Sequence, residues 1–432
     1  MRFFLLILIT LGTLMASSLP KYETKTLKNG LQIVVIPLQN ASNVISTDIF
    51  YKVGSRNEVM GKTGIAHMLE HMNFKSSKHL KAGEFDKEVK SIGGVNNAST
   101  SFDYTHYYIK SSSDNLTTSL DLYAELMQNL SLKDKEFQPE RDVVTEERRW
   151  RTDNNPMGLL YFKLFNNAYI YHPYHWTPIG FMNDIRTWSI KDIRDFHATY
   201  YQPNNALLMV TGDVDPKQVF KEAKKAFGKI KNRVKVPKVK FVEPEQDGAK
   251  RVIIHKESEV EMLAIAFHIP NFQDKDQVTL SVISEILYSG KSSRLYKNLV
   301  EKKQLVNSIY AYNMENKDPG LFLFIASCNP GIKAKDVEKE LIKEINKMKT
   351  TQVTQAELDK VKINTKADFI HSLESSTSVA NLFGSYLVRG DIRPLLSYED
   401  DIEKITAKKV QKVAQKYFNF DKSTTLILKK GH

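Results

Sequence analysis

Two histidines and a glutamate lie inside five residues of the segment GIAHMLEHMNFKSS, at His67, Glu70 and His71. On a helix, residues four apart project from the same face, so the two imidazoles could hold one Zn²⁺ through single nitrogens. Glu70 flanks that face and could be the general base that takes a proton from a water activated by the metal. The pattern H-x-x-E-H is the inverted form of the H-E-x-x-H helix of zinc proteases. The alternative is a half-buried helix with two hydrogen-bonded histidines.

A catalytic zinc site needs three protein ligands and one open position, and the carboxylates of residues 134–154 could supply the third ligand. This segment is predicted to be helical, and i, i+3, i+4, i+7 spacing places four residues on one face: Glu140, Val143, Val144 and Glu147. Valines between two acids predict that this face turns inward, whereas the alternative is ordinary surface charge. We expect Glu147 to be the third ligand. Glu140 is expected to act as a further catalytic residue that orients a ligand histidine or assists proton transfer.

Helices and strands must position these side chains, and the hydrophobic pattern predicts both. Alternating apolar residues predict strands at 30–38, 46–54 and 105–112, and the first two are expected to pair as a hairpin. A period of 3.6 residues predicts a helix at 115–130. Because strands and helices do not alternate regularly, we predict an α+β fold with a mainly antiparallel sheet and helices packed on one face.

Two pairs of similar segments indicate an internal repeat. HMNFKSSKHL resembles LYSGKSSRLY, and their lysines, Lys75 and Lys291, are 216 residues apart (291 − 75). Two further aromatic segments place Tyr200 and Tyr417 217 residues apart (417 − 200). We therefore predict two duplicated homologous domains of the same fold. At an offset of 216, the residues HxxEH of the first copy correspond to three aliphatic residues in the second: Ile283, Ile286 and Leu287. The second copy is predicted to keep the helix and to lack the metal site.

The start of the chain has the layout of a secretory signal peptide, with Arg2, an apolar run from Phe3 to Met15, and small residues after it. The alternative, a membrane anchor, would need a longer apolar run. We expect an exported, periplasmic protein with no stable membrane insertion after cleavage. The predicted organisation, with a linker rich in Lys, Val and Pro between the halves, is a signal peptide at 1–18, a zinc-binding peptidase domain at 19–225, a linker at 226–248 and a non-zinc domain at 249–432.

Charge and cysteine content narrow the possible partners. The net charge is +12, but the lysines are scattered, so we expect no nucleic-acid binding. Cys328 is the one cysteine in the sequence. A disulfide within the chain is therefore impossible, and we expect Cys328 to be a buried residue on a strand.

The segment of the two histidines, SIGGVNNASTSFDYTHYY (91–108) and ERDVVTEE (140–147) together resemble the pitrilysin-type zinc metallopeptidases, family M16 or inverzincins. This family includes the mitochondrial processing peptidase and insulin-degrading enzyme, and the resemblance is closest to its processing-peptidase-like bacterial branch. It implies a zinc metalloendopeptidase with one Zn²⁺ ion. The family's ligands fall on His67, His71 and Glu147, its base on Glu70, and its additional acidic residue on Glu140.

The resemblance also implies where a peptide substrate binds. Gly93 and Gly94 would form a turn, followed by an edge strand beside the zinc that takes up the substrate backbone. The substrate-binding residues implied are Asn97, Ala98 and Ser99. The alternative, from the residues alone, is a plain β-turn.

Self-sufficient members of the family supply an arginine and a tyrosine from the second half, which help to stabilise the oxyanion. Here those positions hold Val300 and Asn307, and Arg294 or Tyr310 could replace them only at a different spacing. We therefore predict a heterodimer in which a second M16-like subunit supplies the arginine and tyrosine. The alternatives are a non-catalytic structural or assembly subunit, and a chain that is active alone.

Overall fold

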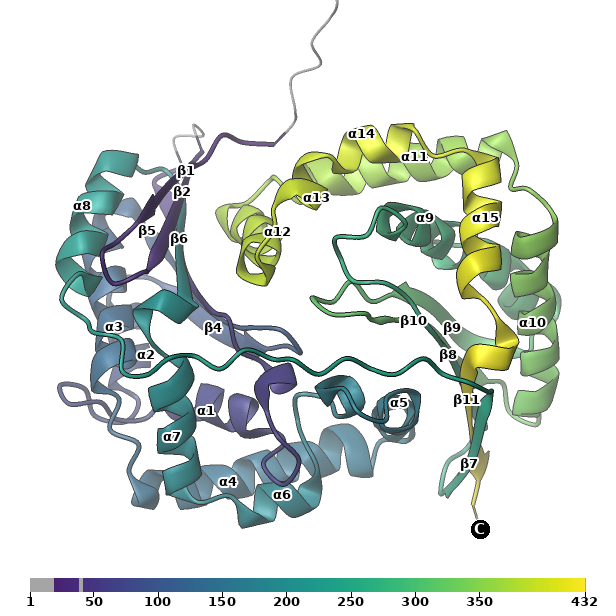
Figure 1. Cartoon of the computed structure of the whole chain (residues 1–432), viewed down its shortest axis with the longest axis horizontal. Helices are drawn as coiled ribbons and strands as arrows, with labels where there is room; N and C mark the ends of the chain where they lie inside the picture. Colours follow the sequence, from purple (N-terminus) through teal and green to yellow (C-terminus); the bar gives the residue numbers. More distant parts are fainter. Residues whose placement is uncertain (1–18, 39–41, 432) are drawn as a thin grey trace, which may run out of the picture.

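The computed structural model describes residues 19–38 and 42–431. The predicted signal peptide, 1–18, lies outside the described residues. The chain forms two halves, each built on one sheet (Figure 1). Within the described residues, no helix is long and apolar enough to cross a lipid bilayer.

The first sheet has the strand order β1-β2-β6-β3-β5-β4. Only β2 and β6 pair in parallel, so the sheet is mainly antiparallel as predicted. The predicted hairpin between β2 and β3 is wrong, because β6 lies between them. The backbone groups of a buried strand need partners on both sides, and β2 pairs on its second side with residues 175 positions later in the chain (207 − 32). The strands are β1 Glu23–Thr26, β2 Gln32–Pro37, β3 Val44–Tyr51, β4 Val95–Thr100, β5 Thr105–Ser112 and β6 Ala206–Gly212.

The second sheet has the order β7-β11-β8-β10-β9. This is the order and direction of β2-β6-β3-β5-β4, including the single parallel pair at β7 and β11. The predicted duplication of one α+β unit is therefore confirmed. Cys328 ends β10 and is fully buried, as predicted. The strands are β7 Lys250–Lys256, β8 Met262–His268, β9 Val306–Asn313, β10 Leu321–Cys328 and β11 Ser423–Lys430.

Most helices of each half lie on one face of its sheet, and their apolar sides form the two largest cores. The helices of the first half are α1 Ile65–Asn73, α2 Glu84–Ser91, α3 Leu116–Asn129, α4 Asp134–Arg148, α5 Pro156–Ala168, α6 Met182–Thr187, α7 Ile190–Tyr200 and α8 Pro216–Phe227. Those of the second half are α9 Gln277–Tyr288, α10 Ala334–Thr350, α11 Gln355–His371, α12 Ser376–Arg389, α13 Arg393–Leu396, α14 Tyr398–Glu403 and α15 Ala407–Tyr417. Every residue of 228–249 is described, and none belongs to a helix or strand.

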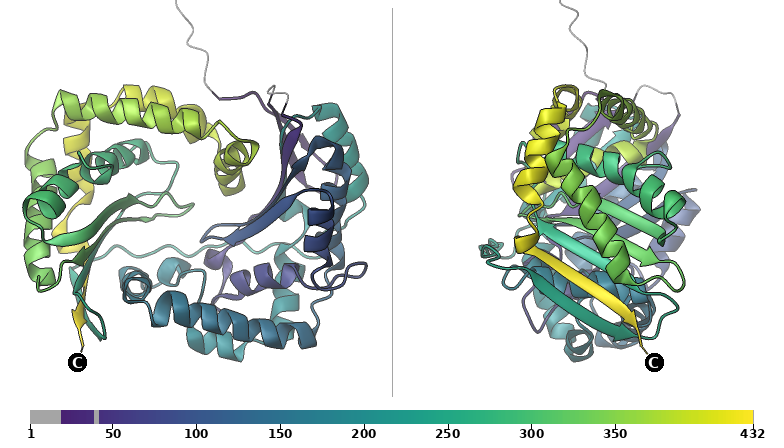
Figure 2. Two further views of the ribbon diagram at one scale, coloured as in Figure 1. Left: turned by 180° about the vertical axis from the view of Figure 1, so that it is seen from behind. Right: turned by 90° about the vertical axis from the view of Figure 1, so that its right-hand side faces the viewer.

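The other face of each sheet is covered by a helix from the opposite half. Helix α5 of the first half packs on β8 and β11, and α12 of the second half packs on β3 and β6. Both views of the ribbon place α12 beside the first sheet (Figures 1 and 2). Gly384 permits this approach, because a Cβ at that position would lie 2.2 Å from Cζ of Phe50 on β3. The helix exchange adds a second helical layer to the one-face arrangement predicted from the sequence.

A buried polar network joins the halves where the β4–β5 and β9–β10 hairpins meet. The guanidinium of Arg56, 8 % exposed, donates to Asp318 at 2.5 and 2.9 Å. The carboxylate of Asp103 accepts from the Tyr174 hydroxyl at 2.5 Å and from the backbone N–H of Lys317 at 2.8 Å. The buried polar groups at this contact thus find hydrogen-bond partners in the opposite half.

Candidate metal centre

Helix α1 directs the H-x-x-E-H residues away from the core. It begins after Gly64, which has a φ of 84° and no space for a Cβ, because one would lie 2.6 Å from the carbonyl oxygen of Ile179. The carboxylate of Glu58 accepts from the backbone N–H groups of Gly64 and Ala66, both at 2.9 Å, and so caps the helix start. The opposite face of α1 is buried in the core: Ile65, Ala66, Met68, Leu69 and Met72.

Helix α4 brings its carboxylates to α1, but its buried face differs from the prediction. Val144 is fully buried, whereas Val143 is 51 % exposed, so the prediction that both valines turn inward is wrong for Val143. The buried line of α4 runs through Phe137, Val144 and Arg148, at i, i+7 and i+11. Glu147 and Glu140 lie on the side of this line that faces α1.

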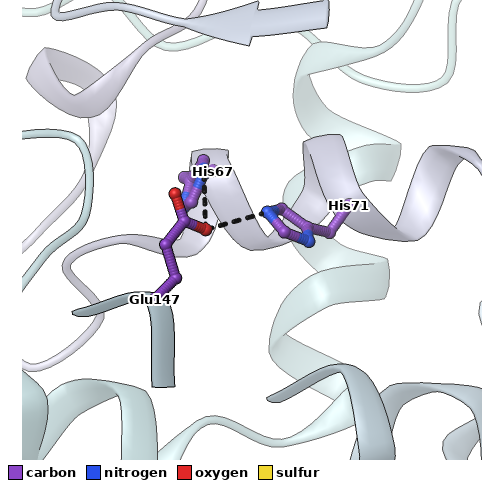
Figure 3. A group of neighbouring side chains, drawn as sticks. All are labelled: His67, His71 and Glu147. Atoms are coloured by element: carbon purple, nitrogen blue, oxygen red, sulfur yellow. Dashed lines mark ion pairs between the residues drawn. The ribbon is translucent and has the colours of Figure 1, made fainter. Parts of the chain in front are cut away.

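His67, His71 and Glu147 form a compact group of three potential ligands (Figure 3). Glu147 Oε2 lies 3.4 Å from His71 Nε2 and 3.7 Å from His67 Nε2, and the three ligand atoms lie within 4.8 Å of one another. Tetrahedral zinc with bonds of 2.0–2.1 Å separates its ligand atoms by about 3.4 Å. Two imidazoles and one carboxylate are also a donor set that catalytic zinc uses. These residues therefore fit a zinc ion with an open fourth position.

Glu140 holds His71 in one orientation. Its Oε1 accepts from His71 Nδ1 at 2.8 Å, and its Oε2 lies 2.5 Å from Lys75 Nζ. Burial would lower the pKa of His71, but hydrogen bonds from His71 to Glu140 and Glu147 outweigh it and raise the pKa to about 9. The bond at Nδ1 leaves Nε2 directed at Glu147, as expected for a metal-binding imidazole with a carboxylate partner.

The second oxygen of Glu147 also has a partner, which the sequence reasoning missed. Arg151 Nε lies 3.0 Å from Glu147 Oε1, one helical turn further along the chain. The i, i+4 spacing of Glu147 and Arg151 on a predicted helix could have indicated this ion pair. Lys75 was missed in the same way, four residues after His71. Both cations favour the ionised form of the carboxylates that they contact.

The side chain of Glu70, a residue of α1, contacts the end of strand β4. Thr100 Oγ1, at the end of β4, donates to Glu70 Oε2 at 2.5 Å. Burial raises the pKa of Glu70, and the Thr100 hydrogen bond acts in the opposite direction. A cavity of about 380 Å³ opens beside it, lined by Glu70, His71, Phe74, Lys75, Asp86, Asn96, Asn97 and Glu140.

Strand β4 is an edge strand, with β5 as its one partner in the sheet. The backbone N–H of Ser101 donates to Tyr104 O in the turn to β5, so residues 97, 99 and 101 turn their backbone groups toward β5. Residues 96, 98 and 100 then face the free edge. Accordingly, the N–H of Ala98 donates to the side chain of Asn97 rather than to β5. Of the predicted substrate-binding residues Asn97, Ala98 and Ser99, only Ala98 offers its backbone to the edge.

Helix α9 of the second half is the counterpart of α1, but its residues do not correspond to those of α1 as predicted. Ile283, Ile286 and Leu287 are 0–3 % exposed and pack into the second core, whereas the H-x-x-E-H residues face away from theirs. The burial patterns of α1 and α9 coincide at an offset of 214 (281 − 67), because two extra residues precede Lys291. The counterparts of His67, Glu70 and His71 are therefore Ser281, Ser284 and Glu285. The predicted aliphatic correspondence is wrong, although the second copy does lack the histidines.

The positions expected for a catalytic arginine and tyrosine hold a partly buried valine, Val300, and an exposed asparagine, Asn307. Val300 packs partly buried against the second core. Asn307, on β9, donates to Cys328 O at 3.4 Å. Arg294 is held by two hydrogen bonds to Glu357, at 2.6 and 2.8 Å.

Comparison with known proteins shows the family of the chain. Residues 34–175 match the family described as Insulinase (Peptidase family M16), and residues 187–365 match the Peptidase M16 inactive domain. The chain is 54 % identical over 428 residues to the zinc protease PqqE of Helicobacter pylori, covering 98 % of this chain and 96 % of that protein.

Two further relatives extend the comparison. The crystal structure of a protease from Helicobacter pylori superposes with a TM-score of 0.94 at 55 % identity, covering 95 % of this chain and 100 % of that one. A probable mitochondrial-processing peptidase subunit beta of Arabidopsis thaliana is 25 % identical over 420 residues, covering 95 % of this chain and 78 % of that protein. The protein therefore belongs to peptidase family M16.

Proposed function

We propose that this protein is the zinc-binding subunit of a metalloendopeptidase that cleaves peptides or unfolded segments. The observation that carries the proposal is the convergence of His67, His71 and Glu147 within 4.8 Å, with Glu70 beside them on α1. When bound, a zinc ion lowers the pKa of a water molecule and polarises a carbonyl group.

The residues of the chain would perform the proton transfer and the positioning. Glu70 accepts a proton at its carboxylate and can return it to the leaving amine. A pKa raised by burial moves this group toward the working pH, which favours both steps. Thr100 holds one oxygen of Glu70, while Glu140 holds His71 in the orientation needed for binding.

The free edge of β4 supports peptides as the substrate class. A substrate in extended conformation could pair with the backbone of Ala98, between the edge strand and Glu70. Main-chain pairing makes few demands on sequence but requires an unfolded segment.

We further propose that a second M16-like subunit completes the active site. The support is that Val300 and Asn307 hold no charged group that could stabilise an oxyanion, and that a relative is named as a subunit. The alternative is a non-catalytic structural or assembly subunit, but the preserved ligand geometry favours catalysis. Export is also proposed, from the signal-peptide pattern of residues 1–18.

The test is to measure bound zinc and peptide cleavage for the chain alone and for its complex with a second M16-type subunit. Glu70→Gln should retain zinc and lose at least about 100-fold in kcat/KM. The exposed Glu146, which pairs with Arg149, provides the control Glu146→Gln, expected to keep both properties. Full activity of Glu70→Gln in the complex would refute the mechanism, and full activity of the chain alone would refute the need for a partner.

A further inference from the structure

The second half contains a cavity of about 510 Å³ for which the proposed reaction has no role. Its walls come mainly from α9, β9, α11 and α12; Figure 1 shows α9, β9 and α11 on the right, with α12 next to the first sheet. This size is typical of sites that take a small ligand or part of a larger one.

The cavity occupies the place that the metal site has in the first half. Helix α9 corresponds to α1 at an offset of 214, and the strands give the same offset for β9 and β4. Strands β5 and β10 are equivalent at an offset of 216, so His106 corresponds to Phe322 (322 − 106). Ser99 of β4 pairs with His106, and Asn313 of β9 pairs with Phe322. Asn313 therefore corresponds to Ser99 (313 − 99 = 214).

Helix α11 corresponds to α4 at an offset of 221. Phe137 and Arg148 on α4, and Leu358 and Phe369 on α11, are all buried and share this offset (358 − 137 and 369 − 148). Glu147 then corresponds to Asp368 (368 − 147 = 221). The counterparts of all four metal-site residues line the cavity: Ser281, Ser284, Glu285 and Asp368.

The cavity is lined by acidic side chains, although the chain as a whole has a net charge of +12. Three carboxylates line it, Glu285, Glu315 and Asp368, and no Lys, Arg or His does so among the described residues. Burial raises the pKa of Tyr398, another lining residue, and these carboxylates raise it further. The neighbouring Arg389 donates to the backbone oxygen of Glu315 at 2.6 Å and lies outside the lining.

The cavity also contains hydrogen-bond acceptors that lack donors. Asn313 is only 8 % exposed, and its Oδ1 has no partner among the residues that the structure describes, while its Nδ2 donates to Ser281 at 3.0 Å. The buried Oε2 of Glu285 likewise has no hydrogen-bond partner among the described residues. Aromatic rings complete the wall: Tyr288, Tyr312, Phe369, Tyr386 and Tyr398. Carboxylates, unpaired acceptors and aromatic faces all favour an organic cation.

We propose that this cavity binds the ammonium or guanidinium group of a peptide, as a recognition site in the position of the metal site of the other half. The proposal rests on the proposed peptidase function only for the choice of a peptide as ligand. It requires neither zinc nor cleavage, so it can fail or succeed independently of that function.

The test measures peptide binding by isothermal titration calorimetry to the chelator-treated full chain, which cannot cleave the probe. The probes are a hexapeptide with both ends capped and one lysine, its arginine and norleucine versions, and the norleucine peptide with a free N-terminus. We expect the lysine or arginine peptide to bind at least ten times more tightly than the capped norleucine peptide. A gain restricted to the free N-terminus would assign the site to the α-ammonium group instead of a side chain.

The variant Glu285→Gln/Asp368→Asn should abolish this preference and leave zinc content unchanged. The matched control is Glu301→Gln/Asp359→Asn, which alters exposed carboxylates on the same half and should keep the preference. If the double variant does not fold, the single variant Asp368→Asn replaces it in the test and is expected to reduce the preference. Equal binding of all four peptides by the parent protein, or a preference that persists in the folded variant, would overturn the proposal.

Discussion

Glu140 and His71 share a hydrogen bond of 2.8 Å that leaves the other ring nitrogen of His71 directed at Glu147. The bond joins two helices, because His71 lies on α1 and Glu140 on α4. The geometry of the candidate metal site therefore depends on how these helices pack as well as on the three candidate ligands.

Removing the charge of Glu140 should weaken metal binding. Glu140→Gln is expected to lower zinc affinity by about 10- to 100-fold, because the amide no longer stabilises the basic form and orientation of His71. Competition with a chromophoric chelator measures this affinity. Glu146→Gln, two turns along the same helix and exposed, is the matched control, and an unchanged affinity in Glu140→Gln would contradict the assigned role.

Blocking the free edge of β4 should impair substrate binding. Ala98→Pro removes an outward N–H group without breaking the pairing to β5, so KM should rise several-fold with a smaller change in kcat. Steady-state kinetics of the proposed complex with a second M16-type subunit tests this. Ala98→Ser keeps the N–H and should behave like the parent; equal KM values for all three proteins would exclude binding at this edge.

The contact between the hairpins should contribute to stability. Arg56→Ala leaves Asp318 and Asp103 without their cation, and we expect a loss of about 2–3 kcal/mol in the free energy of unfolding. Because Asp318 is 27 % exposed, solvent screens this ion pair and limits the loss. Denaturant unfolding of Arg56→Ala, Asp318→Asn and the double variant should show strong non-additivity. Arg251→Ala, at an exposed pair with Glu338, should cost less than about 1 kcal/mol.

His197 should make stability depend on pH. Burial, with the nearby Arg233, lowers the pKa of His197 to about 3, so the folded state binds a proton less readily than the unfolded state. Its contribution is full above the unfolded pKa of about 6.5 and is lost as pH falls through and below that value. Between pH 7.5 and 5.5 the loss is about 1 kcal/mol. His197→Gln should flatten this part of the stability profile, while the exposed His255→Gln should not; parallel profiles for all three would exclude the effect.

The sequence predicted those parts of the site that depend on local periodicity. His67, Glu70 and His71 lie within one helical turn, and Glu147 follows from the 3.6-residue period of α4. The hairpin error and the position of α12 have another cause, since pairing of β2 with β6 and packing of α12 on β3 join residues more than 160 positions apart. The offset of 216 paired the wrong residues of α1 and α9. The second half has two additional residues between α9 and Lys291, and only the burial pattern shows where they lie. Val143 was misplaced because periodicity alone does not fix the centre of a buried face.

The reciprocal packing of α5 and α12 has a consequence for the origin of the chain. Each half lends the other the helix that covers one face of its sheet. A half-length ancestor would have left that face bare as a monomer and could have covered it only by pairing with a second copy of itself. Gene fusion would then have joined two partners that already depended on each other, which left one copy free to lose its histidines while its fold was retained.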